Sequence, residues 1–172
     1  MIEKIMVEIS ANLLCMRETV YIETSILGYL TARRSRDIIV MANIEITREW
    51  WDARRPDFQL YSSQAVVQET TQGDAEIAAQ RLDILSDISL LDLDQAVLEL
   101  ATAFLERSNL PAKANVDAIH IAVATVHGMD YVLTWNCKHI ANAQIQRKLA
   151  EVSLALGYAL PILCTPYELL GG

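Results

Sequence analysis

Three carboxylic acids and one amide stand where short apolar segments of the sequence begin or end. Glu23 follows the run VYI, Glu69 ends QAVVQE, Asp117 begins DAIHIAVA, and Asn136 follows YVLTW. Hard divalent cations such as Mg²⁺ and Mn²⁺ prefer oxygen ligands of this kind, and zinc does not. A bound cation could activate a water molecule and polarise a phosphoryl oxygen. Without a cation, like charges held together would raise the pKa of one or more of the carboxyl groups.

Each of these residues also has a simpler explanation. Glu23 could place its charge at a helix N-terminus. Glu69 could be solvated, and Asn136 could form an Asx turn after a strand. Asp117 differs, because it lies in an otherwise apolar stretch where an unpaired charge would be costly.

Two histidines lie near these candidates. His120 is three residues after Asp117, on the same face of the predicted helix, and we expect a hydrogen-bonded structural role rather than catalysis. His139 could cap a turn or contact substrate. The cysteines are odd in number and far apart, which excludes a zinc ribbon and predicts reduced thiols in the core: Cys15, Cys137 and Cys164.

The sequence also predicts the elements that position these residues. Strand-like apolar runs occupy 20–23, 58–63, 88–93, 131–134 and 161–165. Helical segments occupy 24–32, 37–54, 64–70, 74–86, 94–108, 112–127 and 141–156. We expect Thr24 and Ser25 to cap the first helix and Pro56 to end the second. Of the neighbouring Trp50 and Trp51, one should be buried and the other partly exposed.

Strands that alternate with helices imply crossover connections and a parallel sheet covered on both faces. We therefore predict an α/β fold, a three-layer α/β/α sandwich with a five-stranded parallel sheet and a Rossmann-like topology. In such sheets, ligands bind outside the carboxyl ends of the strands. Glu23 and Asn136 are predicted to stand at such ends.

The 172 residues, 52% of them hydrophobic, suffice for one domain with a proper core. We predict a single domain over 17–172. Residues 1–16 form an extension that packs loosely, docks a partner or reflects a misassigned start, since Met6 and Met16 could also be start codons. No apolar run could span a bilayer, and no signal peptide is evident, so we expect a cytoplasmic protein.

The formal net charge of −8 argues against broad electrostatic binding of nucleic acid but leaves room for a local basic patch. Arg33, Arg34 and Arg36, just after the first predicted helix, are candidates for phosphate contacts. Arg54 and Arg55 form a second group. A solvated face is the alternative for both groups.

Three segments together resemble the motifs of PIN-domain ribonucleases. YIETSILGYL resembles the first motif, in which an acid ends strand one and Thr-Ser and an apolar helix follow. SSQAVVQET resembles the second, a Ser-led short helix ending in Glu. NVDAIHIAVATVHGMDYVLTWNCKHIAN resembles the third and fourth, where Asp-Ala opens an Ala-rich helix and the next strand ends in Thr-X-Asp or Thr-X-Asn. The resemblance covers about residues 19–168 and depends on the order and spacing of the motifs.

The resemblance implies a PIN-like fold and metal-dependent cleavage of RNA with Mg²⁺ or Mn²⁺. It places the metal-binding acids at Glu23, Glu69 and Asp117. Asn136 matches the fourth, more variable position, and Thr24 or Ser25 matches a hydroxyl that supports the first acid. It also implies a VapC-type toxin of a toxin–antitoxin pair, a homodimer, and an antitoxin partner that lies across the acidic edge.

Two positions depart from the family pattern. The first acid is usually Asp and here is Glu23, and the fourth position holds Asn136 instead of Asp. We therefore expect weaker metal binding, or one tight and one loose site. The alternative function is a non-catalytic PIN-like module that binds RNA or a protein. A receiver domain fits poorly, because Asp92 ends the third predicted strand but no acidic pair follows the first.

Overall fold

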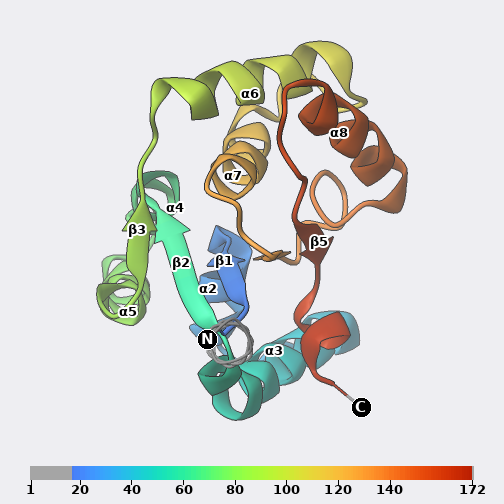
Figure 1. Ribbon diagram of the computed structural model, residues 1–172. Helices are drawn as coiled ribbons and strands as arrows, with labels where there is room; N and C mark the ends of the chain where they lie inside the picture. Colours follow the sequence, from blue (N-terminus) through green and yellow to red (C-terminus); the bar gives the residue numbers. More distant parts are fainter. Residues whose placement is uncertain (1–16, 172) are drawn as a thin grey trace, which may run out of the picture.

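The computed structural model describes residues 17–171, so the predicted extension at residues 1–16 lies outside the described part of the chain. Five strands form one parallel sheet in the order β3-β2-β1-β4-β5 (Figure 1). Their bounds are β1 Thr19–Ile22, β2 Gln59–Ser63, β3 Ser89–Leu91, β4 Tyr131–Leu133 and β5 Ile162–Cys164. The predicted α/β class with a five-stranded parallel sheet is confirmed.

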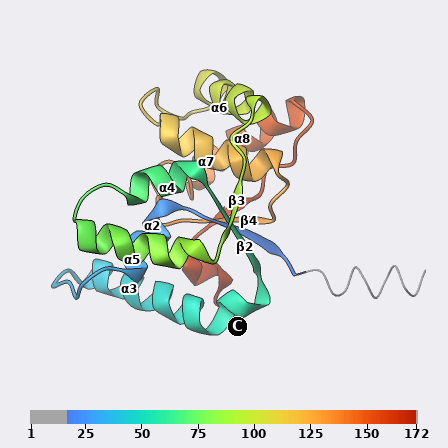
Figure 2. The ribbon, with the colours of Figure 1, turned by 90° about the vertical axis from the view of Figure 1, so that its left-hand side faces the viewer.

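Seven α-helices connect or flank the strands in the described range: α2 Thr24–Leu30, α3 Ile38–Glu49, α4 Gln64–Thr70, α5 Ala75–Ser86, α6 Gln95–Arg107, α7 Asn115–Val126 and α8 Ala143–Ala155. Figure 2 shows α6, α7 and α8 on one side of the sheet and α3 and α5 on the other. None of the helices among residues 17–171 is long and apolar enough to cross a membrane.

The central strand β1 and its neighbour β4 are followed by helices that leave on opposite sides of the sheet. The chain passes from β1 through α2 and α3 to β2, and from β4 through α8 to β5. Figure 2 shows α3 and α8 on opposite sides. Such a reversal opens a crevice at the carboxyl ends of the two strands. Glu23 directly follows β1 and Asn136 lies shortly after β4, so both are at this crevice.

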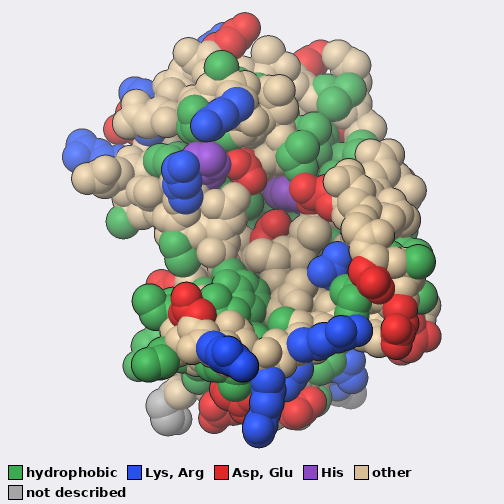
Figure 3. All heavy atoms as spheres, turned by 180° about the vertical axis from the view of Figure 1, so that it is seen from behind, with side chains coloured by type: hydrophobic (Ala, Val, Ile, Leu, Met, Phe, Trp, Pro, Cys, Tyr) green, Lys and Arg blue, Asp and Glu red, His purple; other side chains and the backbone are tan. Residues whose placement is uncertain are grey.

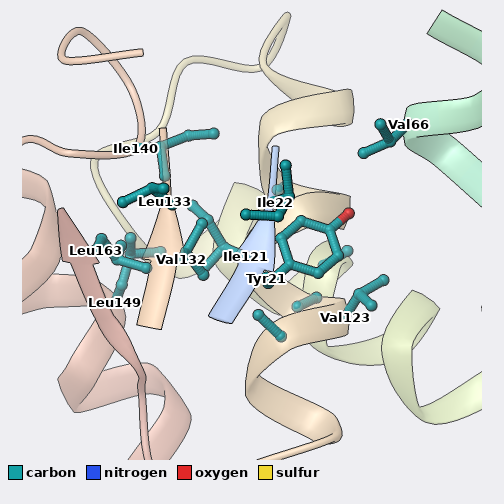
Figure 4. Packing of buried hydrophobic residues seen from close by; sticks show 14 of the residues in the cluster. Tyr21, Ile22, Val66, Ile121, Val123, Val132, Leu133, Ile140, Leu149 and Leu163 are labelled. Carbon is teal, nitrogen blue, oxygen red and sulfur yellow. The ribbon is translucent and has the colours of Figure 1, made fainter. Parts of the chain in front are cut away.

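The core lies between α7 and the strands β1 and β4. Val20, Tyr21 and Ile22 of β1 have no exposed surface, because both faces of this strand are covered. Figure 4 shows Ile121 of α7 packed close to Val132 of β4 and beside β1. Burial on this scale fixes the position of α7 against the sheet. The site residues at the start of α7 are fixed with it.

The predicted helix at 37–54 is the clearest difference in element boundaries. The α-helix ends at Glu49, and a π-helical turn, Trp50–Arg54, and a 3₁₀ turn, Arg55–Asp57, follow. Pro56 has no backbone N–H and cannot continue an α-helix, which explains the change before β2. Trp50 is fully buried and stacks on Phe58 with ring centroids 5.8 Å apart. Trp51 is partly exposed, as predicted.

The two cysteines of the described region differ in environment. Cys164 in β5 is buried and Cys137 is exposed, and both are free thiols. The prediction that all cysteines lie in the core is therefore wrong for Cys137, which follows β4 in a surface turn. Burial raises the pKa of the Cys164 thiol to about 12. Cys15 lies outside the described residues.

Candidate functional site

Acidic and histidine side chains gather in a hollow at the carboxyl edge of the sheet. Figure 3 views the molecule from the side to which the strands run, and Asp, Glu and His side chains lie close together near its centre. The residues that follow β1, β2 and β4 and the start of α7 approach one another here. The hollow is therefore built from segments that are far apart in the sequence.

Glu23 is a buried carboxylate at the N-terminus of α2. Its side chain is held by the backbone N–H of Ser25 at 3.1 Å, by the Ser25 hydroxyl and by the Thr134 hydroxyl at 2.7 Å. All three donors bind the same oxygen, Oε2. Among residues 17–171, Oε1 has no hydrogen-bond donor. Glu23 thus caps the helix, in the place predicted for Thr24 and Ser25, and still has an oxygen to offer a ligand.

Glu69, at the end of α4, is held by two donors from other parts of the chain. Its Oε2 accepts hydrogen bonds from the Thr24 hydroxyl and from Nε2 of His120, the latter at 2.9 Å. Partial burial would raise the pKa of Glu69, but these hydrogen bonds outweigh burial, and the net pKa is below its ordinary value. Glu69 is therefore not a carboxyl group whose pKa is raised by like charges.

His120 is almost completely buried, with 1% of its surface exposed. Its Nδ1 lies 2.8 Å from the hydroxyl of Tyr21, which in turn lies 2.7 Å from the hydroxyl of Ser63. Burial raises the pKa of Tyr21, so this hydroxyl keeps its proton. The expected hydrogen-bonded role of His120 is confirmed, and the ring also faces Glu69.

Asp117, in the first turn of α7, binds the loop after β4. Its Oδ1 accepts a hydrogen bond from Nδ2 of Asn136 at 2.8 Å, and its Oδ2 lies 2.8 Å from Nδ1 of His139. Oδ1 of Asn136 accepts the backbone N–H of His139 at 3.1 Å, so Asn136 forms the turn as well. Each oxygen of Asp117 therefore already has one hydrogen-bond partner within the protein.

The structure brings part of the predicted acidic set into one group. Ligand-type atoms of Glu23, Glu69 and His120 all lie within 4.8 Å of one another, and this is the one such group found among residues 17–171. Asp117 stands outside this group, with Asn136. Thr134 joins the two parts, because its hydroxyl binds Glu23 and accepts the backbone N–H of Asn136 at 2.9 Å.

The predicted arginines fall at opposite edges of the sheet. The loop between α2 and α3, with Arg33, Arg34 and Arg36, lies at the end to which the strands run (Figure 2), and these side chains are exposed. Arg54 and Arg55 instead precede the amino end of β2. Arg54 pairs with Asp57 at 3.2 Å, and Arg55 lies over the Trp51 ring. This second group is not near the carboxylates.

The donor set fits a divalent cation. Glu23 and Glu69 are rigidly held, and each keeps an oxygen that receives no hydrogen bond from residues 17–171. Two negative charges at this separation, one of them 6% exposed, are costly unless a positive charge is near. Oxygen ligands held in advance are what Mg²⁺ and Mn²⁺ require.

Comparison with known proteins gives one family and one fold. A family model described as PIN domain matches residues 20–139, a range that contains all four predicted site positions. The solved structures include a match to VapBC2 from Rickettsia felis, crystallised bound to a DNA fragment from their promoter. The match has 15% sequence identity and a TM-score of 0.53, and it covers 86% of this chain and 98% of that chain. Comparison with curated proteins gives no match.

Proposed function

This chain belongs to the PIN domain family, and on that premise we propose that it is a metal-dependent ribonuclease that hydrolyses phosphodiester bonds in RNA. The observation that carries the proposal is the meeting of Glu23 and Glu69 at the carboxyl edge of the sheet, with His120 beside them and Asp117 linked through Asn136 and Thr134.

The proposed metal-site residues are Glu23, Glu69, Asp117 and Asn136, with Mg²⁺ or Mn²⁺ as the ion. When bound, the ion would activate water and offset the charge on the phosphoryl oxygens. The protein supplies the positioning: Ser25 and Thr134 hold Glu23, and Thr24 holds Glu69. These contacts fix the carboxylates before any ligand arrives.

Substrate contacts are proposed for the rim of the hollow. Arg33, Arg34 and Arg36 are exposed in the loop between α2 and α3, and Lys and Arg side chains border the acidic hollow in Figure 3. His139 is partly exposed beside Asp117 and offers its second ring nitrogen to solvent or substrate. Contacts of this kind position a phosphate backbone without reading its sequence.

We further propose that the protein is a VapC-type toxin that acts in the cytoplasm as a homodimer and is held by an antitoxin. The VapBC2 complex from Rickettsia felis has the same fold, which supports this proposal. A basic side chain of an antitoxin placed across the acidic hollow would compete with the cation for Glu23 and Glu69.

The test is cleavage of total cellular RNA by the purified full chain with MnCl₂ or MgCl₂. We expect Asp117→Asn and Glu23→Gln to abolish cleavage while the circular dichroism spectrum remains native. Glu106→Gln, an equivalent change on the exposed part of α6, is the matched control and should retain full activity. Undiminished cleavage by both site variants would refute the assignment.

A non-catalytic PIN-like module is the second candidate. The observation in its favour is that Asp117 and Asn136 are already hydrogen-bonded to each other and to His139, so an ion would compete with these contacts for their oxygens. Calorimetric titration with MnCl₂ separates the two candidates. Absence of binding in the wild type would favour the module, and binding that Glu23→Gln weakens would favour the nuclease.

A further inference from the structure

We propose that His120 is a ligand of the metal ion together with Glu23 and Glu69, so that this site binds a transition-metal ion such as Mn²⁺ or Co²⁺ in preference to Mg²⁺. The inference rests on the proposed function only in requiring that this edge of the sheet binds a divalent cation. The ligands that the PIN-domain motifs place at this site all bind through oxygen, and His120 would add one nitrogen ligand.

His120 lies close enough to Glu23 and Glu69 to share one ion with them. The ligand-type atoms of the three residues lie within 4.8 Å of one another. Two ligands on opposite sides of one ion are about 4.2 Å apart when each bond is about 2.1 Å long. Side-chain shifts of less than about 1 Å would therefore bring all three onto one ion. His120 and Glu23 are both more than nine-tenths buried, so their positions are fixed by packing.

A second group holds the other side of the His120 imidazole. A metal-binding histidine almost always has a partner on its other ring nitrogen, which fixes the ring and its tautomer. For His120 that partner is the Tyr21 hydroxyl on Nδ1, with Ser63 behind it. The partner is provided by β1, so the ring is held rigidly against the sheet.

Hydroxyl groups can donate or accept, and this allows His120 to use either tautomer. With Nε2 protonated, the ring donates to Glu69 and accepts from Tyr21. With Nδ1 protonated, the ring donates to Tyr21, Tyr21 donates to Ser63, and the Nε2 lone pair faces Glu23 and Glu69. The exchange moves the ring proton from Nε2 to Nδ1 and reverses the hydroxyl hydrogens, and the Tyr21 hydroxyl stays hydrogen-bonded to both His120 and Ser63 in either tautomer.

A nitrogen ligand changes which ion is preferred. Mg²⁺ strongly prefers oxygen ligands and keeps much of its water, whereas imidazole binds first-row transition metals well. An added neutral imidazole contributes no negative charge, so it strengthens binding of a hard ion such as Mg²⁺ less than another carboxylate would. We therefore expect preference for Mn²⁺ and, more strongly, for Co²⁺.

The chain has three histidines, so three single variants can identify which of them binds the metal ion. His127 is remote from this group, because its Nε2 lies 2.9 Å from the backbone carbonyl of Asp92. His139 is bound to Asp117. The untagged full chain would be loaded with MnCl₂, and pulsed electron paramagnetic resonance would detect ¹⁴N coupling from an imidazole bound directly to the ion. We expect the signal in wild type, His127→Gln and His139→Gln, and its loss in His120→Gln.

Metal affinity gives an independent measurement. By calorimetry, His120→Gln should weaken Co²⁺ and Mn²⁺ binding by about 10-fold or more, and Mg²⁺ binding by less than about 3-fold. If His120→Gln does not fold, the assignment still follows by elimination from the other two histidine variants. Tyr21→Phe then serves as the second variant, and it should weaken Mn²⁺ binding more than Mg²⁺ binding.

Three outcomes would overturn the inference: no ¹⁴N coupling in the wild type, loss of the coupling in His139→Gln, or equal weakening of Mg²⁺ and Mn²⁺ binding in His120→Gln. The last result would make His120 a positioning residue for Glu69. RNA cleavage with Mn²⁺ but no ¹⁴N coupling would refute this inference alone. Coupling without cleavage would refute only the proposed ribonuclease.

Discussion

Thr134 is the residue that joins the two halves of the site. It is fully buried, donates to Glu23 at 2.7 Å and accepts the backbone N–H of Asn136 at 2.9 Å. Thr134→Val keeps the shape and removes both hydrogen bonds. We expect a loss of about 1–3 kcal/mol in the free energy of unfolding and weaker Mn²⁺ binding, measured by urea denaturation and calorimetry. Thr125→Val, which removes one bond to the Ile121 carbonyl within α7, should leave Mn²⁺ affinity unchanged.

The two described cysteines make a second prediction at the residue scale. Burial raises the pKa of the Cys164 thiol to about 12, so at pH 8 almost none of it is the reactive thiolate. Burial and the charge of Glu168 also raise the pKa of Cys137, so its reaction should still be accelerating above pH 9, but this side chain is exposed. In a Cys15→Ser background, a thiol reagent followed by mass spectrometry should modify Cys137 alone. Modification of Cys164 in the native protein would contradict its burial.

The acids of the site could be predicted from sequence, but the groups that hold them could not. Glu23 and Glu69 stand out because Glu23 follows an apolar strand and Glu69 ends the short apolar helix after the next strand. Their partners come from far along the chain: Thr134 is 111 residues from Glu23, and His120 is 51 residues from Glu69. Side-chain hydrogen bonds across such separations depend on the exact packing of helices on the sheet. The apolar context of Asp117 signalled that it has a partner and did not identify His139.

Among the elements, α7 contributes most to both the core and the site. It carries Asp117 and His120 on one face, and its buried residues pack against β1 and β4 (Figure 4). Ile121→Ala, at a fully buried position, should lower the free energy of unfolding by about 2–5 kcal/mol, because it leaves a cavity. Leu154→Ala on α8, where the side chain is 76% exposed, should change it by less than about 0.5 kcal/mol. Urea denaturation measures both, and equal losses would contradict this role of α7.

Hydrophobic periodicity was enough to predict the position of a helix or strand whose surroundings stay the same along its length. The helix predicted at 64–70 agrees with α4 at both ends. The end of the helix in segment 37–54 was harder to predict, because the hydrophobic periodicity continues past Glu49. Pro56 and the buried Trp50 instead force a π-helical turn and then a 3₁₀ turn. The backbone geometry of these turns depends on the packing of Trp50 against Phe58, which lies in a later segment.

At the scale of the whole molecule, the parallel sheet was predictable and the strand order was not. Alternation of strands and helices requires crossovers, but several orders satisfy that rule. The order β3-β2-β1-β4-β5 makes β1 and β4 neighbours. That adjacency brings Glu23 to Thr134 and places the crevice between the two halves of the sheet.

The distribution of charge gives the last prediction. The chain has a formal net charge of −8, so any affinity for RNA must come from a local group of cations. The loop residues Arg33, Arg34 and Arg36 are exposed at the edge that holds the carboxylates. Replacing all three by Gln should weaken binding of a single-stranded RNA oligonucleotide. It should also reduce the slope of log Kd against log salt by about 2, because each lost phosphate contact contributes about 0.7.

A matched triple variant tests whether position or total charge matters. Arg107, Arg147 and Lys148 lie on α6 and α8, and the last two already pair with Glu151 at 3.6 and 2.8 Å. Changing them to Gln alters the net charge of the chain by the same amount. Fluorescence anisotropy between 50 and 200 mM salt, a range over which phosphate contacts change affinity strongly, should show little change for this control. If both triple variants lose affinity and slope equally, the loop makes no direct phosphate contacts, and RNA senses only the overall charge.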